Sequence, residues 1–239
     1  MPGGHYIALS GMRTRLDQLD RLATDLANAE TTGYKGERIS TAEEQRSAFS
    51  DQLTSAIDVS LSGRRLDTSA GTIEPTGMEL DMAIDGEGYF EISTPGGVRY
   101  TRNGHFARSG SGQLVTSEGL PVMGENGPIQ LQPGPVSVGS DGMVMTTSGP
   151  AGRIKVVRFD EPGRLVREGR GRLNAAGMTP LAGTAYAIRP QSLEGSNVSV
   201  VMHVAELANV TRAFEALQKS VAVFMNDIDG KAIESFGRR

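Results

Sequence analysis

Three histidines are the side chains of this 239-residue chain best suited to binding a metal ion or transferring a proton. They are His5, His105 and His203, and no two of them have the spacing of three or four residues that places two ligands on one helix face. The chain contains no Cys, so thiolate ligands, disulfides and cysteine nucleophiles are excluded. The sequence therefore predicts no metal site.

Carboxylates near a glycine-containing turn are the next candidates for chemistry. Asp81 with Asp85, and Glu87 with Glu91, are of the type that general acid–base catalysis uses, but carboxylates beside turns are more often solvated surface groups. The stretch 86–88, Gly-Glu-Gly, continues without the third glycine of a dinucleotide-binding fingerprint. The chain also lacks the G-x-S-x-G motif of serine hydrolases. We expect no enzyme activity and no cofactor.

The charge pattern argues against nucleic-acid binding. The formal net charge is -4, and residues 1–40 and 195–239 each carry five basic and five acidic residues. No basic face for nucleic acid or anionic lipid is therefore expected. The sequence has no run of about 18 apolar residues, which a membrane-spanning helix would need. Its first residues also lack the pattern of a cleavable secretory signal.

Both ends of the chain carry an apolar repeat with alternating spacings of three and four residues, which is typical of a helix that packs on another helix. Gly33 is expected to end the first helix. The second helix is expected at about 198–229, after the turn and capping residues 194–197 and before Gly230. The N-terminal stripe is Leu9, Met12, Leu16, Leu19, Ala23 and Leu26, and the C-terminal stripe is Leu207, Val210, Phe214, Leu217, Val221, Phe224 and Ile228.

These stripes are candidate interface residues, because an isolated helix is only marginally stable in water and its apolar side needs a partner. That partner is either the other helix of the same chain, as in a helical hairpin, or a helix of a neighbouring chain. The periodicity alone does not distinguish the two arrangements.

The middle of the chain consists of short apolar runs separated by Asn-Gly, Asp-Gly and Pro-Gly-Gly turns, a pattern typical of antiparallel strands. Strands are expected at 80–84, 89–93, 98–101, 113–116, 121–123, 129–132, 136–138, 143–147, 153–159, 164–167 and 185–189. We therefore predict an α+β fold, in which an antiparallel all-β domain is inserted into a discontinuous coiled-coil stalk made by the two terminal helices. The expected divisions are 1–36 for the N-terminal helix of an assembly domain, 37–75 for a connector, 76–192 for the β-rich domain and 193–239 for the C-terminal helix.

Several blocks of sequence, taken together, resemble a known family. They are Ala-Leu-Ser-Gly-Met at 8–12, Leu-Ala-Asn-Ala at 26–29, Thr-Thr-Gly-Tyr-Lys at 31–35, 80–90, 100–106, Leu-Glu-Gly-Ser-Asn-Val at 193–198 and 212–215. In order and spacing these blocks resemble the bacterial flagellar axial proteins of the rod and hook. The signature positions singled out by this resemblance are Asn28, Thr32, Gly33, Tyr34, Ser196 and Asn197.

The resemblance implies a structural subunit, closest in length to the proximal-rod members, with the distal-rod members second. It further implies a helical polymer built by the terminal helices around a central channel, with copies of itself and other rod subunits as partners. Export through the flagellar type III apparatus without a cleavable signal, to a periplasmic rod, is also implied. The family often has Asn where this chain has Asp25, and often has acidic residues where this chain has Met202 and His203. The rival interpretation is a soluble β domain, a binding module or an enzyme, carried on a helical hairpin.

Overall fold

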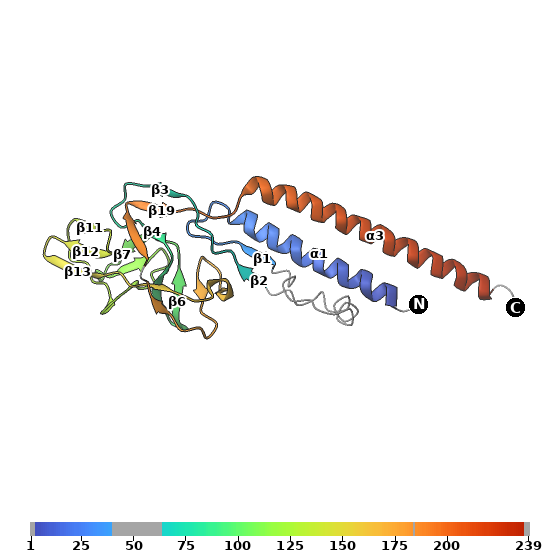
Figure 1. Ribbon diagram of the computed structural model, residues 1–239, viewed down its shortest axis with the longest axis horizontal. Coiled ribbons are helices and arrows are strands. Elements are labelled where there is room, and N and C mark those ends of the chain that lie inside the picture. Colours follow the sequence, from blue (N-terminus) through green and yellow to red (C-terminus); the bar gives the residue numbers. More distant parts are fainter. Residues whose placement is uncertain (1–2, 40–63, 184, 237–239) are drawn as a thin grey trace. The chain divides into compact units, whose positions relative to one another are not determined.

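The computed structural model describes residues 3–39, 64–183 and 185–236 and confirms the predicted α+β composition (Figure 1). It divides into two compact units. A helical unit contains helices α1 (Gly3–Ala27) and α3 (Val200–Phe236), and a β unit contains Asn28–Arg38 and Arg65–Val198. Among the residues that are described, no helix is long and apolar enough to cross a membrane.

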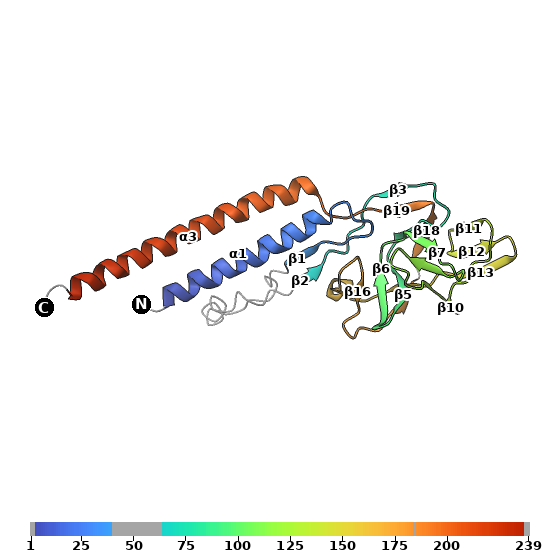
Figure 2. The same ribbon diagram turned by 180° about the vertical axis from the view of Figure 1, so that it is seen from behind.

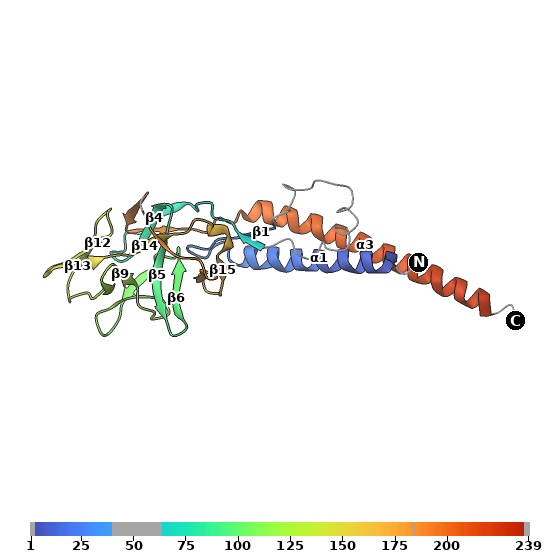
Figure 3. The same cartoon turned by 60° about the horizontal axis from the view of Figure 1, so that its bottom comes forward.

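In the helical unit, α1 and α3 lie side by side and run in opposite directions (Figures 1 and 2). The order of their contacts follows this antiparallel arrangement: Gly11 lies against Leu217, Arg21 against Glu206, and Asp25 against His203. Viewed from another side, α3 continues past the first residue of α1 (Figure 3). The helix pair therefore forms within one chain.

Both helices have ends that differ from those expected. α1 ends at Ala27 rather than near Gly33, because the next residues form turns in which Asn28 O accepts a hydrogen bond from Thr31 N (3.0 Å). α3 begins at Val200 and continues through Gly230 to Phe236. A single glycine costs a helix only about 1 kcal/mol relative to Ala, so Gly230 is a weak stop signal.

The β unit consists of short strands, and every pairing whose register is described is antiparallel. The first strands along the chain are β1 (Glu37–Ile39), β2 (Arg64–Leu66), β3 (Ile73–Pro75), β4 (Met82–Gly86), β5 (Tyr89–Thr94), β6 (Gly97–Thr101), β7 (Phe106–Arg108), β8 (Leu114–Thr116), β9 (Met123–Gly124) and β10 (Gly127–Pro128). They are followed by β11 (Val136–Val138), β12 (Met143–Thr146), β13 (Gly149–Arg153), β14 (Val156–Arg158), the short 3-10 helix η2 (Pro162–Arg164), β15 (Val166–Arg167), β16 (Leu173–Asn174), β17 (Leu181–Ala182), β18 (Tyr186–Pro190) and β19 (Ser192–Glu194).

A six-stranded sheet with the order β15-β16-β6-β5-β14-β17 is the largest sheet of the described residues, and β5 lies near its centre. Successive side chains of a strand point to opposite faces. Phe90 and Ile92 of β5 accordingly enter one hydrophobic core, while Tyr89 enters a second core with Tyr100 and Phe159. The strand is thus buried on both faces, and it separates the two cores.

The predicted connector, 37–75, is described only at its two ends. Residues 40–63 lie outside the described residues, and they include Phe49, Leu53 and Ile57, whose spacing in the sequence permits a short helix. Where the structure describes this segment, β1 pairs with β2 and β3 pairs with β19. Residues 28–36 and 193–198, which the sequence groups with the helices, belong to the β unit.

Candidate functional site

The α3 stripe is the surface that α3 turns toward α1. Val210 is buried, and Leu207, Phe214, Leu217 and Val221 are half-buried, whereas most of their neighbours along the helix are exposed. Phe224 and Ile228 lie beyond the described side chains. Packing of these apolar groups against α1 stabilises the pair, since burying one Leu or Phe contributes roughly 1.5–3 kcal/mol.

The α1 stripe, in contrast, lies mostly to the side of the contact with α3. The α1 residues that are fully buried are Leu22 and Asp25, and neither belongs to the stripe. Two stripe residues come one position after these buried residues: Ala23 comes after Leu22, and Leu26 comes after Asp25. One residue corresponds to a turn of about 100° around a helix, so the stripe lies to the side of the main contact.

Exposure agrees with this displacement of the α1 stripe. Leu16 is 46% exposed and Ala23 is exposed, whereas Met12, Leu19 and Leu26 are half-buried. The side chain of Leu9 is outside the described residues. The apolar periodicity of α1 therefore marks a surface that α3 leaves partly open.

Polar groups complete the contact between the two helices. Arg21 Nη2 lies 3.1 Å from Glu206 Oε1, and His203 Nε2 lies 3.8 Å from the buried Asp25 Oδ2. Asp25 and His203 are two positions at which the sequence departs from the family pattern, and they lie opposite each other. The two departures therefore occur together at one contact of this helix pair.

Several of the sequence blocks that carry the family resemblance contact one another inside the β unit. Gly33 N donates a hydrogen bond to Glu194 O (2.7 Å), which joins the block that follows α1 to the block that precedes α3. Gly33 has φ +67, and a Cβ there would lie 2.3 Å from Asn103 N. Only glycine fits both the left-handed backbone and this close approach.

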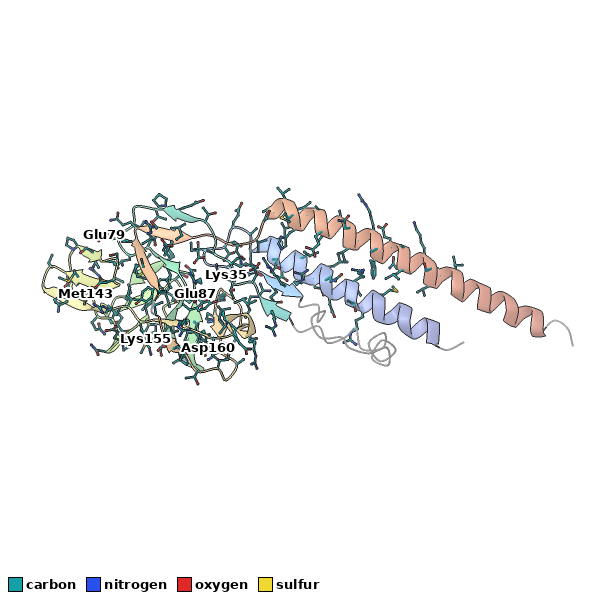
Figure 4. The ribbon with its side chains drawn as sticks, in the orientation of Figure 1. Lys35, Glu79, Glu87, Met143, Lys155 and Asp160 are labelled. Atoms are coloured by element: carbon teal, nitrogen blue, oxygen red, sulfur yellow. The ribbon has the colours of Figure 1, made fainter. Side chains whose placement is uncertain are left out.

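Three charged side chains from these blocks, Lys35, Arg102 and Glu194, form a buried cluster that we call the ionic clasp. Lys35, labelled in Figure 4, donates to Glu194 Oε1 (2.6 Å) and to Ser69 O (2.7 Å). Arg102 Nη1 donates to Glu194 Oε2 (3.1 Å), and Gly71 N donates to Glu194 Oε1 (2.9 Å). Glu194 is only 1% exposed. The carboxylate thus joins four separate segments of the chain.

The clasp contains two cations and one anion, and all three side chains are buried. Burial, and secondarily the charge of Arg102, lowers the pKa of Lys35, which Glu194 partly opposes. Further donations from Arg102 to Ile84 O (3.1 Å) and Gly86 O (2.8 Å) spread its positive charge over backbone carbonyls. The Arg102 guanidinium also lies 5.3 Å from the ring centroid of Tyr89, at cation–π distance. Burial raises the pKa of that tyrosine to about 12.

The remaining signature residues support the same region. Asn197 Oδ1 accepts from Gly36 N (2.8 Å), and its Nδ2 donates to Asp67 O (2.9 Å). Ser196 Oγ accepts from Val198 N (3.2 Å). Because α3 starts only at Val200, the Asn197 side chain does not cap it as its position suggested, but holds β-unit backbone instead. Asn28 Oδ1 accepts from Thr31 Oγ1 (3.2 Å), and Thr32 is half-buried.

The arginine-rich segment 153–172 also contributes to this region. Arg167 donates to Glu37 Oε1 (3.0 Å) and to the Tyr34 hydroxyl, and its guanidinium lies 4.9 Å from the Tyr34 ring centroid. Every arginine of the segment has an acidic partner: Arg153 with Asp141, Arg158 with Asp160, Arg164 with Glu161, Arg167 with Glu37, and Arg170 and Arg172 with Glu118. The segment therefore does not form an unpaired basic surface.

The residues first considered for chemistry are held in pairwise contacts. His105 Nδ1 lies 2.7 Å from Asp81 Oδ1, and Thr76 Oγ1 donates to Asp81 Oδ2 (2.7 Å). Within the described part of the chain, the second ring nitrogen of His105 has no hydroxyl within hydrogen-bond distance, so a Ser-His-Asp arrangement is not completed. Likewise, no group of three or more His, Asp or Glu side chains suited to a metal ion occurs among the described residues.

Periodicity detected the stripes but not the clasp. Lys35 and Glu194 are 159 positions apart, and hydrophobic spacing carries no information about contacts at that separation. All three clasp residues do lie in blocks that carry the family resemblance, which was the only signal in the sequence that pointed to them. Arg167 lies outside those blocks, and nothing in the sequence distinguished it from the other arginines of its segment.

Comparison with known proteins gives matches over the whole chain. A family model described as "Flagellar hook protein FlgE/F/G D1 domain" matches residues 83–146. A "Flagellar basal-body rod protein FlgF" of Caulobacter vibrioides is 34% identical over 100% of this chain and 99% of its own length, and one of Rhizobium meliloti is 31% identical over 99% of each. A "Flagellar basal-body rod protein FlgG" of Bacillus subtilis is 31% identical over 90% of this chain and 92% of its own length.

Proposed function

Because the chain belongs to the family of flagellar basal-body rod proteins, we propose that it is a structural subunit of the flagellar rod. The observation that carries this proposal is the extent of the similarity, which runs from end to end and so includes both terminal helices as well as the β unit. A ligand-binding or enzymatic domain borrowed from this family would need only the β unit.

The terminal helices supply the assembly surface in this proposal. The α3 stripe holds α1 within the chain, and the paired helices form the coiled-coil stalk of one subunit. The α1 stripe, with Leu16 46% exposed, is then available to a neighbour. Residues 1–36 and 193–239 act together as the assembly domain, and packing of apolar seams between subunits gives a rod that transmits torque.

The same chain is proposed to serve in the proximal rod. The relatives named FlgF from Caulobacter vibrioides and Rhizobium meliloti match over 99% of their own length, and the relative named FlgG from Bacillus subtilis matches over 92% of its own length. Its partners are copies of itself and other rod subunits. The subunit is proposed to reach the periplasmic basal body through the flagellar type III export apparatus.

Deletion of the gene, followed by imaging of isolated basal bodies, tests this function. We expect growth to stop at the proximal rod, with no hook or filament, and motility to return when the wild-type gene is supplied. A basal body that stops after completing a proximal rod would instead identify a distal-rod subunit. A deletion strain with complete basal bodies and normal swimming would contradict the proposed function.

A further inference from the structure

The three charges of the ionic clasp come from positions far apart in the chain, and the anion comes last. Lys35 precedes Glu194 by 159 positions, and Arg102 precedes it by 92. Each of the three residues is at most 5% exposed. A chain that emerges from its N-terminus therefore contains both cations long before it contains the carboxylate that neutralises them.

The segment that carries Glu194 also supplies the last strand pairings of the β unit. β18 pairs with β4, and β19 pairs with β3. In the described sheets, β3 and β4 have no other strand as a neighbour. Beyond β19, Gly195 N donates to Thr72 O (2.8 Å) and Asn197 N donates to Tyr34 O (3.3 Å). The first part of the β unit thus stays unpaired until the last part arrives.

Arg102 links the clasp to the packing of the second core. Its Nη1 donates to Ile84 O (3.1 Å) and its Nη2 to Gly86 O (2.8 Å), and its guanidinium lies 5.3 Å from the ring centroid of Tyr89, a member of that core. Packing around Tyr89 therefore removes the guanidinium from water. A buried charge without a partner is strongly unfavourable, so this packing is favourable only when Glu194 is in place.

Neither cation of the clasp has another way to be neutralised at low cost. An arginine does not lose its proton in proteins, so Arg102 needs an anion. Burial lowers the pKa of Lys35, because the interior disfavours the charged ammonium. Glu194 is the carboxylate that pairs with both cations, at 2.6 Å from Lys35 Nζ and 3.1 Å from Arg102 Nη1.

We propose that the ionic clasp sets the order of folding, so that the β unit packs only after Glu194 has joined Lys35 and Arg102. A chain released from its N-terminus then stays unfolded until residues 193–198 have emerged. The use of this order, though not its mechanism, rests on the proposed export. A partly exported chain would not form an incomplete β unit, in which the unpaired edges of β3 and β4 invite aggregation.

Folding and unfolding rates of the whole 239-residue chain test this order. A group that is needed to reach the folded state changes the refolding rate, whereas a group that only holds the folded state changes the unfolding rate. Four of the five tyrosines lie in the β unit, at positions 34, 89, 100 and 186, and the chain has no Trp. Stopped-flow tyrosine fluorescence after dilution from urea therefore follows the β unit.

Glu194→Gln removes the anion and keeps the shape of the side chain. We expect it to refold about 100-fold or more slowly than the wild type, while its unfolding rate changes less than about 3-fold. Glu194→Asp keeps the charge but shortens the side chain, and it is the second variant if Glu194→Gln does not fold. Its smaller loss of stability should also appear mainly as slower refolding.

The matched control is Asp85→Asn, because Asp85 and Arg189 also join β4 and β18 by an ion pair, but an exposed one. This variant should refold within about 3-fold of the wild-type rate. Wild-type refolding of the Glu194 variants, with the loss confined to faster unfolding, would overturn the proposal, as would a control that refolds as slowly as they do. Either result leaves the rod function intact, whereas normal swimming after deletion of the gene contradicts the rod function itself.

Discussion

At the scale of single residues, Glu194 is the buried anion of the ionic clasp. Its carboxylate accepts hydrogen bonds from Lys35, Arg102 and the backbone N–H of Gly71, and its own carbonyl accepts from Gly33 N. Buried ion pairs are often no more stabilising than apolar packing, but removing one partner leaves an uncompensated charge in the interior. The geometry therefore predicts a strong asymmetry between losing Glu194 and losing an exposed carboxylate.

Replacing Glu194 with Gln leaves Lys35 and Arg102 buried without their counter-ion. We expect the free energy of unfolding of the β unit to fall by about 3–5 kcal/mol, measured by urea denaturation. Asp85→Asn is the matched control, because the Asp85–Arg189 pair is exposed and such pairs contribute no more than about 1 kcal/mol. Equal losses in the two variants would show that the clasp does not depend on its buried anion.

Tyr89 gives the β unit a defined response to alkaline pH. Its pKa is about 12 in the folded protein and 10.0 for an unperturbed tyrosine, so between these values the folded state binds more protons than the unfolded state. Stability contributed by the neutral phenol is complete below pH 10 and is lost as the pH rises toward 12. The lowered pKa of Lys35 has the opposite effect on stability. Between that pKa and 10.5 the unfolded state binds more protons than the folded state, so stability rises with pH there.

The variant Tyr89→Phe keeps the buried ring but removes the ionisable group. We expect it to lose less stability than the wild type between pH 10 and about 12, with a difference that approaches 2–3 kcal/mol at the upper end, since one pKa unit corresponds to about 1.4 kcal/mol. Urea denaturation across this range measures the difference. Parallel curves for the two proteins would mean that Tyr89 is not the titrating group.

At the scale of elements, the sequence predicts a strand well where apolar alternation and turn chemistry agree. Strands expected at 89–93 and 98–101 are found as β5 and β6, joined at the glycine turn with Thr94 opposite Gly97. β13, in contrast, has the sequence Gly-Pro-Ala-Gly-Arg, and only its pairing with β12 makes it a strand. Residues 129–132, expected as a strand, contribute buried Ile129 and Leu131 to the core from an irregular segment.

For the helices, too, apolar spacing predicts only part of the structure. Apolar spacing predicts the surface that α3 turns toward α1, because that surface is apolar throughout. On α1 the surface toward α3 includes Gly11, Arg21 and Asp25, so a search for apolar periodicity finds the neighbouring stripe instead. The clasp could not be predicted from spacing, because its members come from positions 35, 102 and 194.

At the scale of the whole molecule, the contacts that join the two ends of the β unit involve neither helix. The segment after α1 and the segment before α3 are joined by the Gly33–Glu194 hydrogen bond and by the clasp, and both contacts lie inside the β unit. The stability of the β unit is therefore expected to be independent of helix pairing. Substitutions in the helices then act on the helical unit and on assembly alone.

Two substitutions to Asp separate pairing within the chain from assembly between chains. Leu217→Asp puts a charge against α1 near Gly11 and should destabilise the helix pair by up to about 3 kcal/mol, because it replaces a half-buried Leu of the contact. Leu16→Asp lies on the open stripe and should cost less than about 1 kcal/mol. Both variants should abolish swimming, but only Leu217→Asp should lose helical circular dichroism in the purified chain, while the β unit of each keeps its urea midpoint. Normal swimming with Leu16→Asp would show that the α1 stripe is not an assembly surface, and equal loss of helix in both would show that the stripe holds the pair itself.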